Sequence, residues 1–437
     1  MTKSCVKIIF LITLLSFLIW PPSGLAKRDR VVISDPSLQK IPIAIPLFKV
    51  QPHLMDVSMK TSDFCSETLD FTGYFKLLDR GSFLAAPREI DITGSTINFK
   101  NWTAVGAELM ITGSVQVNND LIEMELRLFD TFKGQMLVGK KYKGWITDHQ
   151  RMIRRFCSEV IYYLTGSQGI FDSKIAFVSN GSGNKEIYIC DFDGQNTKRF
   201  THNNAITLFP AWSSNGKWLA YTSYKKGKPD IYIRHLKENR GFVINRKGIN
   251  STPEWVPGKF SLAATLSYEG DQEIYLLTGK GKKIKKLTNK WGIDTSPAWS
   301  PDGRKMAFVS NRSGTPQIHV KHIGSGSVER LTFQGRYNTQ PSWSPKGDKI
   351  AYSARGKSGR YNICTIGFDG GGPTRLTRAG DNESPSWSPD GSMIAFSSTR
   401  QGASRIYVMT AYGTDQRRLL ALRGEQTNPK WSPGGVD

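Results

Sequence analysis

Residues 297–310 read Pro-Ala-Trp-Ser-Pro-Asp-Gly-Arg-Lys-Met-Ala-Phe-Val-Ser, and this stretch decides the fold. Its first seven residues return with few changes at 341–347 and 385–391. The Trp recurs at intervals of 43 or 44 residues, at Trp212, Trp255, Trp299, Trp343, Trp387 and Trp431. Self-similarity at such a period is typical of repeat architectures, in which each repeat is one supersecondary unit.

Each repeat has the pattern of four short strands. Ser-Pro-Asp-Gly suits a type I turn, because Pro presets φ at its second position and Gly fits its fourth, so the Trp strand and the apolar strand after it form a hairpin. A third strand, such as Gln317–Val320, and a fourth that ends in Arg-Leu-Thr, as at Arg330–Thr332, complete the unit. Four antiparallel strands per 44 residues predict a propeller blade, and six repeats predict a six-bladed β-propeller.

The two ends of the repeat array are incomplete in complementary ways. The array begins with the apolar strand at Ile175 and lacks a Trp strand before it, whereas it ends with the Trp431 strand and lacks an apolar strand after it. We therefore expect the C-terminal strand to pair with Ile175–Ser179 and close the ring, which removes two exposed edges. Because the Trp recurs at one register, we interpret it as packing between blades rather than as a sugar platform. Asp191–Gly194 is interpreted as a hairpin turn, since it lacks the other ligands of a calcium loop.

Residues 27–168 carry no such repeat and predict a small α/β domain ahead of the propeller at 169–437. Expected strands cover Ile41–Val50, Phe75–Leu78, Leu109–Val117, Ile122–Leu128 and Met136–Tyr142. Helices are expected over Met55–Leu69 and from Met152 to Leu164, where apolar residues recur at i, i+3 and i+4. Thr147 and Gln150 fit a capping box before the second helix, and Gly166 is a suitable stop after it.

The first 26 residues have the pattern of a secretory signal peptide. Lys3 and Lys7 precede an apolar run that ends at Trp20, and small residues stand before a possible cut ahead of Lys27. We expect an exported chain, so nucleic acid is not expected as a partner although the formal net charge is +22. Five cations fall within seven residues, Lys280, Lys282, Lys283, Lys285 and Lys286, and fit either a solvated turn or a contact with an anionic wall polymer or lipid surface.

No recognised catalytic pattern is present. The six His residues do not accompany a Gly-x-Ser-x-Gly elbow, and neither a Walker loop nor a dinucleotide fingerprint occurs. None of the Cys residues lies in a Cys-x-x-Cys pair, so no metal or redox motif is supported. A disulfide between Cys65 and Cys157, both expected on helices of the first domain, stays open. We expect no enzyme activity, no catalytic residues, no cofactor and no metal site.

The chain resembles the TolB family, periplasmic propeller proteins of the Tol–Pal system with WD40-like repeats. The likeness rests on Ile41–Phe48, Gly73–Arg80, Trp102–Val117 and Leu164–Gly166, in that order after a signal peptide, and continues into Lys174–Ser179. The Trp-Ser-Pro-Asp-Gly repeats alone are shared by many propellers. Ser213–Gly216 lacks the Pro and Trp255–Gly258 is one residue short, so altered turns are expected in the second and third blades.

The resemblance implies a monomeric, non-enzymatic adaptor in the periplasm. TolB-like proteins bind Pal, the peptidoglycan-associated lipoprotein, through one propeller face, and TolA of the inner membrane through the mature N-terminus. They associate peripherally with the outer membrane through these partners and support its integrity and its constriction during cell division. Applied to the loops of one propeller face, this predicts a partner site at Ile249, Asn250, Asp294, Thr295, Tyr337, Asn338, Asn382 and Glu383. The predicted TolA contact is Lys27, Arg28, Asp29, Arg30, Val31, Val32 and Ile33, where the apolar triplet can add a strand to a partner sheet or form the first strand of its own domain.

Two other functions remain open. An exported hydrolase or lyase would use the propeller funnel and needs converging carboxylates or a nucleophile with its base. A carbohydrate-binding protein would use exposed aromatic residues such as Tyr337 and Tyr412.

Overall fold

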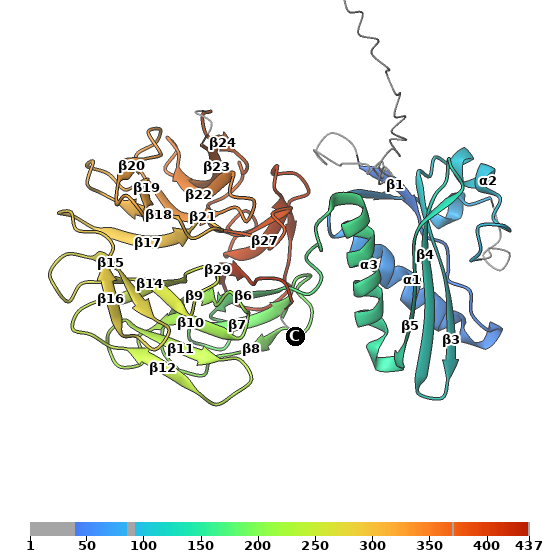
Figure 1. Ribbon diagram of the computed structural model, residues 1–437, viewed down its shortest axis with the longest axis horizontal. Coiled ribbons are helices and arrows are strands. Elements are labelled where there is room, and N and C mark those ends of the chain that lie inside the picture. The colour runs from blue at the N-terminus through green and yellow to red at the C-terminus, as the bar shows by residue number, and fades with distance from the viewer. Residues whose placement is uncertain (1–39, 85–91, 369–370, 436–437) are drawn as a thin grey trace, which may run out of the picture.

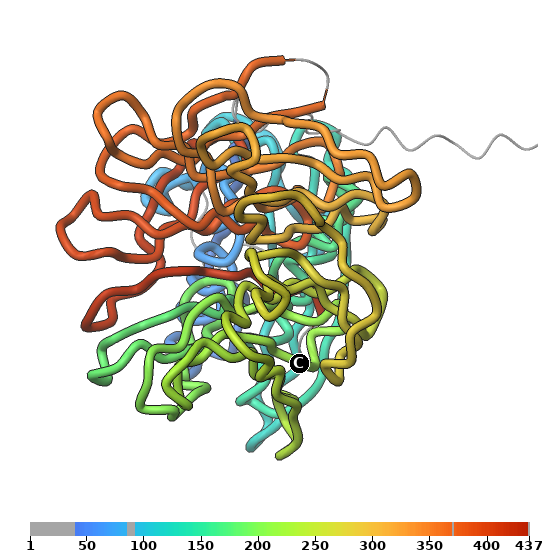
Figure 2. The backbone as a smooth tube through the Cα atoms, turned by 90° about the vertical axis from the view of Figure 1, so that its left-hand side faces the viewer, coloured from blue at the N-terminus to red at the C-terminus, as the bar shows by residue number. Residues whose placement is uncertain are grey.

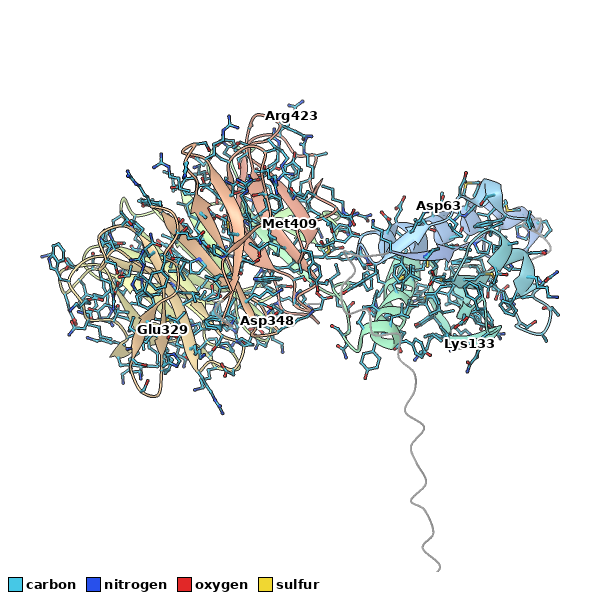
Figure 3. All side chains as sticks on the ribbon, turned by 90° about the horizontal axis from the view of Figure 1, so that it is seen from above. Asp63, Lys133, Glu329, Asp348, Met409 and Arg423 are labelled. Carbon is cyan, nitrogen blue, oxygen red and sulfur yellow. The ribbon has the colours of Figure 1, made fainter. Side chains whose placement is uncertain are left out.

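The structure is a computed structural model that describes residues 40–84, 92–368 and 371–435. It contains two bodies, an N-terminal α/β domain and a six-bladed β-propeller, joined side by side (Figures 1 and 3). The expected signal peptide at 1–26 and the predicted N-terminal contact at Lys27–Ile33 lie outside the described residues.

The N-terminal domain is a five-stranded mixed sheet in the order β2-β1-β3-β4-β5, with two helices packed against each other on it. Its strands are β1 (Ile41–Ala44), β2 (Phe75–Leu77), β3 (Leu109–Asn118), β4 (Leu121–Asp130) and β5 (Gln135–Trp145). Its helices are α1 (Met55–Asp70), the short α2 (Phe99–Ala104) and α3 (His149–Thr165), with 3-10 turns at Pro52–Leu54, Arg80–Ser82 and Ile146–Asp148.

The structure tests four local expectations for this domain. The first strand ends at Ala44 rather than Val50, because Pro46 has no N–H to donate to a ladder. The capping box is wrong: α3 follows a 3-10 turn, its N-cap is Asp148, and no side chain caps it. Gly166 does end the helix, in the left-handed conformation at φ 78°. The four cysteines of the described residues are free, so Cys65 and Cys157 form no disulfide, although both are buried and lie together where α1 meets α3.

The propeller has six four-stranded antiparallel blades, as predicted. From the innermost strand outward, blade 1 is β29 (Gln426–Trp431), β6 (Lys174–Ser179), β7 (Glu186–Asp191) and β8 (Lys198–Arg199). Blade 2 is β9 (Thr207–Trp212), β10 (Trp218–Ser223), β11 (Asp230–His235) and β12 (Gly241–Ile244). Blade 3 is β13 (Asn250–Trp255), β14 (Ser261–Leu266), β15 (Glu273–Thr278) and β16 (Lys283–Lys286). Blade 4 is β17 (Asp294–Trp299), β18 (Lys305–Ser310), β19 (Gln317–His322) and β20 (Val328–Arg330). Blade 5 is β21 (Asn338–Trp343), β22 (Lys349–Arg355), β23 (Tyr361–Gly367) and β24 (Thr374–Arg375). Blade 6 is β25 (Asn382–Trp387), β26 (Met393–Ser398), β27 (Arg405–Thr410) and β28 (Arg417–Arg418).

The ring is closed by the two ends of the repeat array. Strand β29 pairs antiparallel with β6, with Gln426 opposite Ser179 and Trp431 opposite Ile175. The side chain of Ser432 accepts a hydrogen bond from the backbone N–H of Lys174 at 2.8 Å. This is the closure that the incomplete end repeats predict.

The recurring Trp residues are structural. All six are buried. Three of them donate the indole N–H to a backbone carbonyl of the preceding blade: Trp255 to Ala211, Trp387 to Ser342, and Trp212 to Lys430. At the ring closure, Trp431 donates its indole N–H to the hydroxyl of Ser173, just before β6. Packing between blades therefore accounts for the repeat, as predicted.

The two domains share one apolar cluster, which runs from the N-terminal sheet and helices into blades 1 and 6. Arg154 of α3 anchors the contact, donating to Asp191 at 2.9 Å and to Asp193 at 2.8 Å in the turn after β7. The Asp191–Gly194 turn is thus a hairpin turn, as predicted, and it also docks the first domain. A second contact joins Arg417 of β28 to the carbonyl of Phe71 and to Asp70, and Lys40 pairs with Asp415 at 2.9 Å.

Candidate functional site

The propeller presents two faces of different character. The loops at 200–206, 245–249, 287–293, 331–337, 376–381 and 419–425 precede the innermost strands and emerge on one side, which we call the loop face. The short hairpin turns between innermost and second strands, such as Ser300–Gly303, emerge on the other side, which we call the turn face. The contacts with the N-terminal domain that involve Asp191, Asp193 and Asp415 fall in turns of the turn face. The loop face therefore stays free of the first domain in the described part of the chain.

Polar side chains seal the base of the loop face. The first residue of every innermost strand is polar and fully buried: Thr207, Asn250, Asp294, Asn338, Asn382 and Gln426. Each lies five residues before a repeat Trp. A buried polar group is stable only when it is hydrogen-bonded, and their side chains bond the loop that precedes each strand or the neighbouring third or second strand.

Three examples show these bonds. The amide of Asn338 donates to Gln317 at 2.7 Å and to the carbonyl of Gln334 at 2.8 Å. The side-chain amide of Asn250 donates to the carbonyl of Arg246 at 2.8 Å. The carboxylate of Asp294 forms an ion pair with Arg312 at 2.5 Å. The loops are consequently fixed from below, and the loop face is a rigid surface.

The Thr of Arg-Leu-Thr belongs to the same arrangement. The hydroxyl of Thr332 donates to Gln317 at 2.8 Å and accepts from the backbone N–H of Ile318 at 2.9 Å. The residues Thr201, Thr288 and Thr377 accept from the equivalent N–H groups, each at 2.9 Å. The motif therefore ties the fourth strand to the third at the loop-face end of each of these blades.

The eight predicted partner-binding residues divide into buried and accessible ones. Asn250, Asp294, Asn338 and Asn382 are buried and bonded within the propeller, so the prediction that their side chains present themselves to a partner is corrected. Ile249, Thr295 and Glu383 are half-buried at the same level, and Tyr337 is exposed. All eight residues lie on or just below the loop face, and the exposed parts of that face are the tips of its loops.

Two exposed aromatic residues on this face were missed from the sequence. Phe333 is 71% exposed and precedes Tyr337 in the loop between blades 4 and 5, and Trp291 is 87% exposed in the loop between blades 3 and 4. Exposed apolar side chains that gather on one face can mark an interaction surface, whereas single ones are common on any protein. Their position outside the repeat register was the signal that could have marked them.

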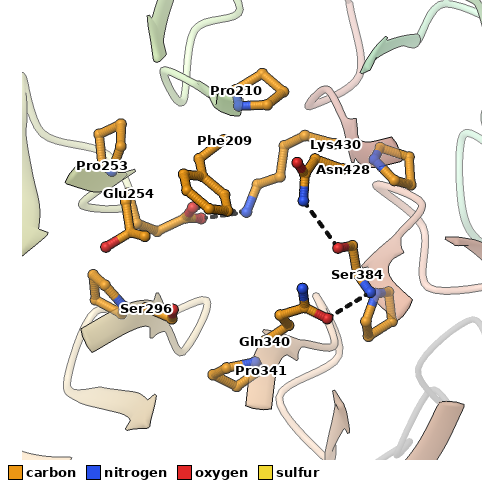
Figure 4. Close-up of a pocket in the computed structure, with 14 residues that line it drawn as sticks. Phe209, Pro210, Pro253, Glu254, Ser296, Gln340, Pro341, Ser384, Asn428 and Lys430 are labelled. Carbon is orange, nitrogen blue, oxygen red and sulfur yellow. Dashed lines mark hydrogen bonds and ion pairs between the residues drawn. The ribbon is translucent and has the colours of Figure 1, made fainter. Parts of the chain in front are cut away.

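A narrow channel runs along the axis of the ring. On the loop-face side it forms a pocket of about 100 Å³, lined by a Pro from each innermost strand and by the residue before that Pro (Figure 4). Those six preceding residues have positive φ: Phe209, Thr252, Ser296, Gln340, Ser384 and Asn428. Non-glycine residues rarely adopt this conformation, and here it creates the bulge that interrupts pairing in every innermost strand.

An ion pair closes the channel. The ammonium of Lys430 on β29 lies 2.7 Å from both carboxylate oxygens of Glu254 on β13, and the two side chains face each other across the lumen (Figure 4). Both residues also line the depression on the turn-face side. Among the described residues that line the pocket, Glu254 supplies the carboxylate, and it is in ion-pair contact with Lys430.

Glu383 lies beside this pocket. Burial, together with the negative charge of Asp381, raises the pKa of Glu383 above its usual range. A hydrogen bond from Gln340 lowers the pKa but does not outweigh these two effects. A raised pKa in the folded state means that ionised Glu383 destabilises the fold, so this cost is absent below pH 4.5 and appears as pH rises through the raised value.

We therefore expect Glu383→Gln to increase stability at pH 7 and to change it little at pH 4. Chemical denaturation at the two pH values measures this. An equal effect of the substitution at both would contradict the assignment.

The two aromatic residues considered for carbohydrate binding lie on different faces of the propeller. Tyr337 precedes β21 on the loop face, whereas Tyr412 follows β27 on the turn face.

Within the described residues there is no cluster of three His, Cys, Asp or Glu side chains suited to a metal ion. None of the helices in that part of the chain is long and apolar enough to cross a membrane.

Fold and site together define a two-domain β-propeller protein with a docked N-terminal α/β domain and a free, rigid loop face. Residues 162–434 match the model of the TolB beta propeller domain, and residues 29–137 match that of the TolB amino-terminal domain. The chain belongs to the TolB family of Tol–Pal system proteins. The resemblance seen in Ile41–Phe48 and Gly73–Arg80 is thereby confirmed.

Similar proteins agree with this membership. The Tol-Pal system protein TolB of Desulfosudis oleivorans is 57% identical over 279 residues, 63% of this chain and 64% of that protein. A TolB homolog of Chlorobaculum tepidum is 46% identical over 223 residues, 50% of this chain and 49% of that protein. The matched segment thus spans about half to two thirds of the length of these relatives. The crystal structure of TolB from Acinetobacter baumannii superposes with a TM-score of 0.81 at 29% identity and covers 90% of this chain and 97% of that one.

Proposed function

We propose that this protein is a non-enzymatic periplasmic adaptor of a Tol–Pal system. It binds a Pal-type peptidoglycan-associated lipoprotein through the loop face and a TolA-type inner-membrane protein through Lys27–Ile33, and so supports outer-membrane integrity and constriction at division. The observation that carries the proposal is the loop face itself, which is free of the first domain, fixed from below by buried hydrogen bonds and tipped with exposed aromatic residues. A rigid scaffold with exposed loops is the usual arrangement for partner contact.

The partner contact is expected to centre on the loop between blades 4 and 5. Phe333 is stacked against the guanidinium of Arg330 at 4.9 Å, and Tyr337 packs edge-on against Tyr361 at 6.3 Å. Held in this way, the two rings lose little further freedom on binding, which favours their role as anchors. Ile249, Thr295 and Glu383 would border them.

We expect Phe333→Ala combined with Tyr337→Ala to weaken binding of a purified Pal-type domain by about 30-fold or more, because buried aromatic anchors contribute about 2 kcal/mol or more. Isothermal titration calorimetry measures the dissociation constant. Phe132→Ala is the matched control, since Phe132 is 72% exposed but lies on the N-terminal domain. Equal affinities for the aromatic double variant and the control would remove the loop face from the proposal.

The N-terminal contact is tested separately. A chain that starts at Asp35 should keep its affinity for the Pal-type domain and lose binding to a purified TolA-type protein. Retained TolA binding would show that Lys27–Ile33 is not the site.

A further inference from the structure

The outer edge of blades 3 and 4 carries a concentration of unpaired positive charge, which we call the basic edge. Blades 3 and 4 lie opposite blades 6 and 1, so this edge is the part of the propeller farthest from the N-terminal domain (Figure 1). Figure 2 views the molecule from this end, and in Figure 3 Glu329 of β20 marks it, away from Asp63 and Lys133 of the first domain.

The charges follow the outermost strand of blade 3 from one face to the other. Lys280 and Lys282 stand in the turn before β16, Lys285 is on the strand, and Lys290 follows in the loop-face loop; all four are exposed. Two other lysines are neutralised, because Lys283 pairs with Glu269 at 2.7 Å and Lys286 lies 3.6 Å from Glu273. Within the described residues Lys280, Lys282 and Lys285 have no acidic partner.

Blade 4 adds a further cation to this field. Lys321 on β19 has its pKa lowered by burial and by the positive charges of Arg312 and Lys285. Cations held within reach of one another repel, and an anionic surface laid over them would relieve that repulsion. One acid, Glu329, stands nearby with its side chain 57% exposed and 3.1 Å from the ring of His322.

Exposed apolar side chains stand among these cations. Ile284 lies between Lys283 and Lys285 and is 51% exposed, and Trp291 follows Lys290 and is 87% exposed. A hydrated anionic polymer would satisfy the lysines and leave both apolar groups in water. A bilayer surface satisfies both kinds of group, because Trp is favoured at the membrane interface and Lys at anionic headgroups.

We propose that the basic edge binds the surface of an anionic phospholipid bilayer, with Lys280, Lys282 and Lys285 at the headgroups and Trp291 at the interface. The contact uses Trp291 of the loop face but neither Phe333 nor Tyr337, at which the partner contact is expected to centre, so separate variants test the two proposals. It gives a small part of the chain's excess positive charge a ligand.

The test uses the chain from Lys27 onward, which keeps every described residue, in co-sedimentation with two kinds of vesicle. One is pure phosphatidylcholine and the other is phosphatidylcholine mixed with phosphatidylglycerol in equal parts. The wild-type chain should partition to the anionic vesicles and not to the neutral ones, and sodium chloride should release it.

The triple variant Lys280→Glu, Lys282→Glu and Lys285→Glu should lose on the order of 100-fold in partitioning, because each basic residue contributes roughly five-fold near an anionic surface and reversal adds repulsion. The matched control is Lys100→Glu, Lys133→Glu and Lys143→Glu on the N-terminal domain, which changes the net charge equally. The control should lose only about two-fold, since its charges lie beyond a Debye length from the edge. Unchanged thermal unfolding of both variants shows that they are folded.

Trp291 gives an independent readout. Vesicles with brominated acyl chains should quench part of the tryptophan fluorescence of the wild-type chain, and Trp291→Phe should remove that quenching. The proposal is overturned by equal loss in the two triple variants, by absence of a preference for anionic vesicles, or by undiminished quenching in Trp291→Phe. Binding to purified peptidoglycan in place of vesicles would assign the edge to a wall polymer and likewise overturn it.

Discussion

A chain that lacks residues 426–437 is expected to have no cooperative unfolding transition of the propeller at the melting temperature of the wild-type chain. These residues supply β29, the innermost strand of blade 1, which pairs with β6 along its length. Strand β29 also bonds its neighbours, since Trp212 donates to the carbonyl of Lys430 at 2.9 Å and the N–H of Trp431 donates to Ser386 at 2.9 Å.

The expected loss is large because a single buried Trp replaced by Ala already costs about 3–5 kcal/mol. Trp431 is only 4% exposed, and the truncation also leaves β6 with an unpaired edge. The total approaches the whole stability of an ordinary domain, which is about 5–15 kcal/mol.

Circular dichroism during heating and limited proteolysis measure the effect of this truncation. The matched control removes only residues 433–437, which leaves β29 and Ser432 in place and should unfold like the full chain. If both truncations melted at the wild-type temperature, ring closure by β29 would not be what stabilises the propeller.

The second large effect is expected from Arg154→Leu. The Arg154 side chain is only 13% exposed, donates to Asp191 and Asp193, and lies over the rings of Phe64 and Phe192 at 5.6 Å and 5.1 Å. Removing one partner of a buried ion pair leaves the other charge uncompensated and typically costs about 3–5 kcal/mol. Lys174 remains 2.9 Å from Asp191, so we expect the lower end of this range, about 3 kcal/mol.

The domain contact should loosen in this variant, with faster proteolysis in the link at 166–173. Arg151→Leu is the control, because Arg151 lies on the exposed side of the same helix. A triple variant with Asp191→Asn and Asp193→Asn added should recover part of the lost stability. The proposed anchor would be refuted by Arg154→Leu and Arg151→Leu proteins of equal stability and protease resistance.

The same contact makes a pH prediction. Burial alone would raise the pKa of Asp191, but hydrogen bonds from Asn196, Arg154 and Lys174 outweigh it and hold the pKa below 3.8. A lowered pKa in the folded state means that Asp191 stabilises the fold above pH 3.8, and that this stabilisation is lost as pH falls through the lowered value. Arg154→Leu should therefore reduce the acid dependence of stability, as measured by denaturation between pH 2 and 5.

The sequence could predict the propeller because its repeat is local and periodic. The spacing of Trp299 and Trp343 sets the blade length, Ser-Pro-Asp-Gly sets the hairpin, and the missing strand beside Ile175 forces closure. Each of these signals lies within one repeat or at its ends, so one chain contains all the information needed.

The site was predicted less well because it depends on which atoms the fold brings together. Asn250, Asp294, Asn338 and Asn382 are polar residues near loops, and polarity near a loop suggested exposure. They stand at one register, as the Trp residues do, and the same argument that made Trp structural applies to them. Arg154 could not be found in this way, because its partners lie 37 and 39 residues away in another domain.

Because β29 pairs with β6, blade 1 can form only after the strand at the C-terminal end of the propeller has been synthesised. A ribosome makes the second strand of blade 1 near residue 175 and its innermost strand about 250 residues later. At a synthesis rate of about 5–20 residues per second, that interval lasts on the order of tens of seconds. A nascent chain therefore carries an unpaired β edge on β6 until β29 has been made, and an exposed strand edge is a template for aggregation.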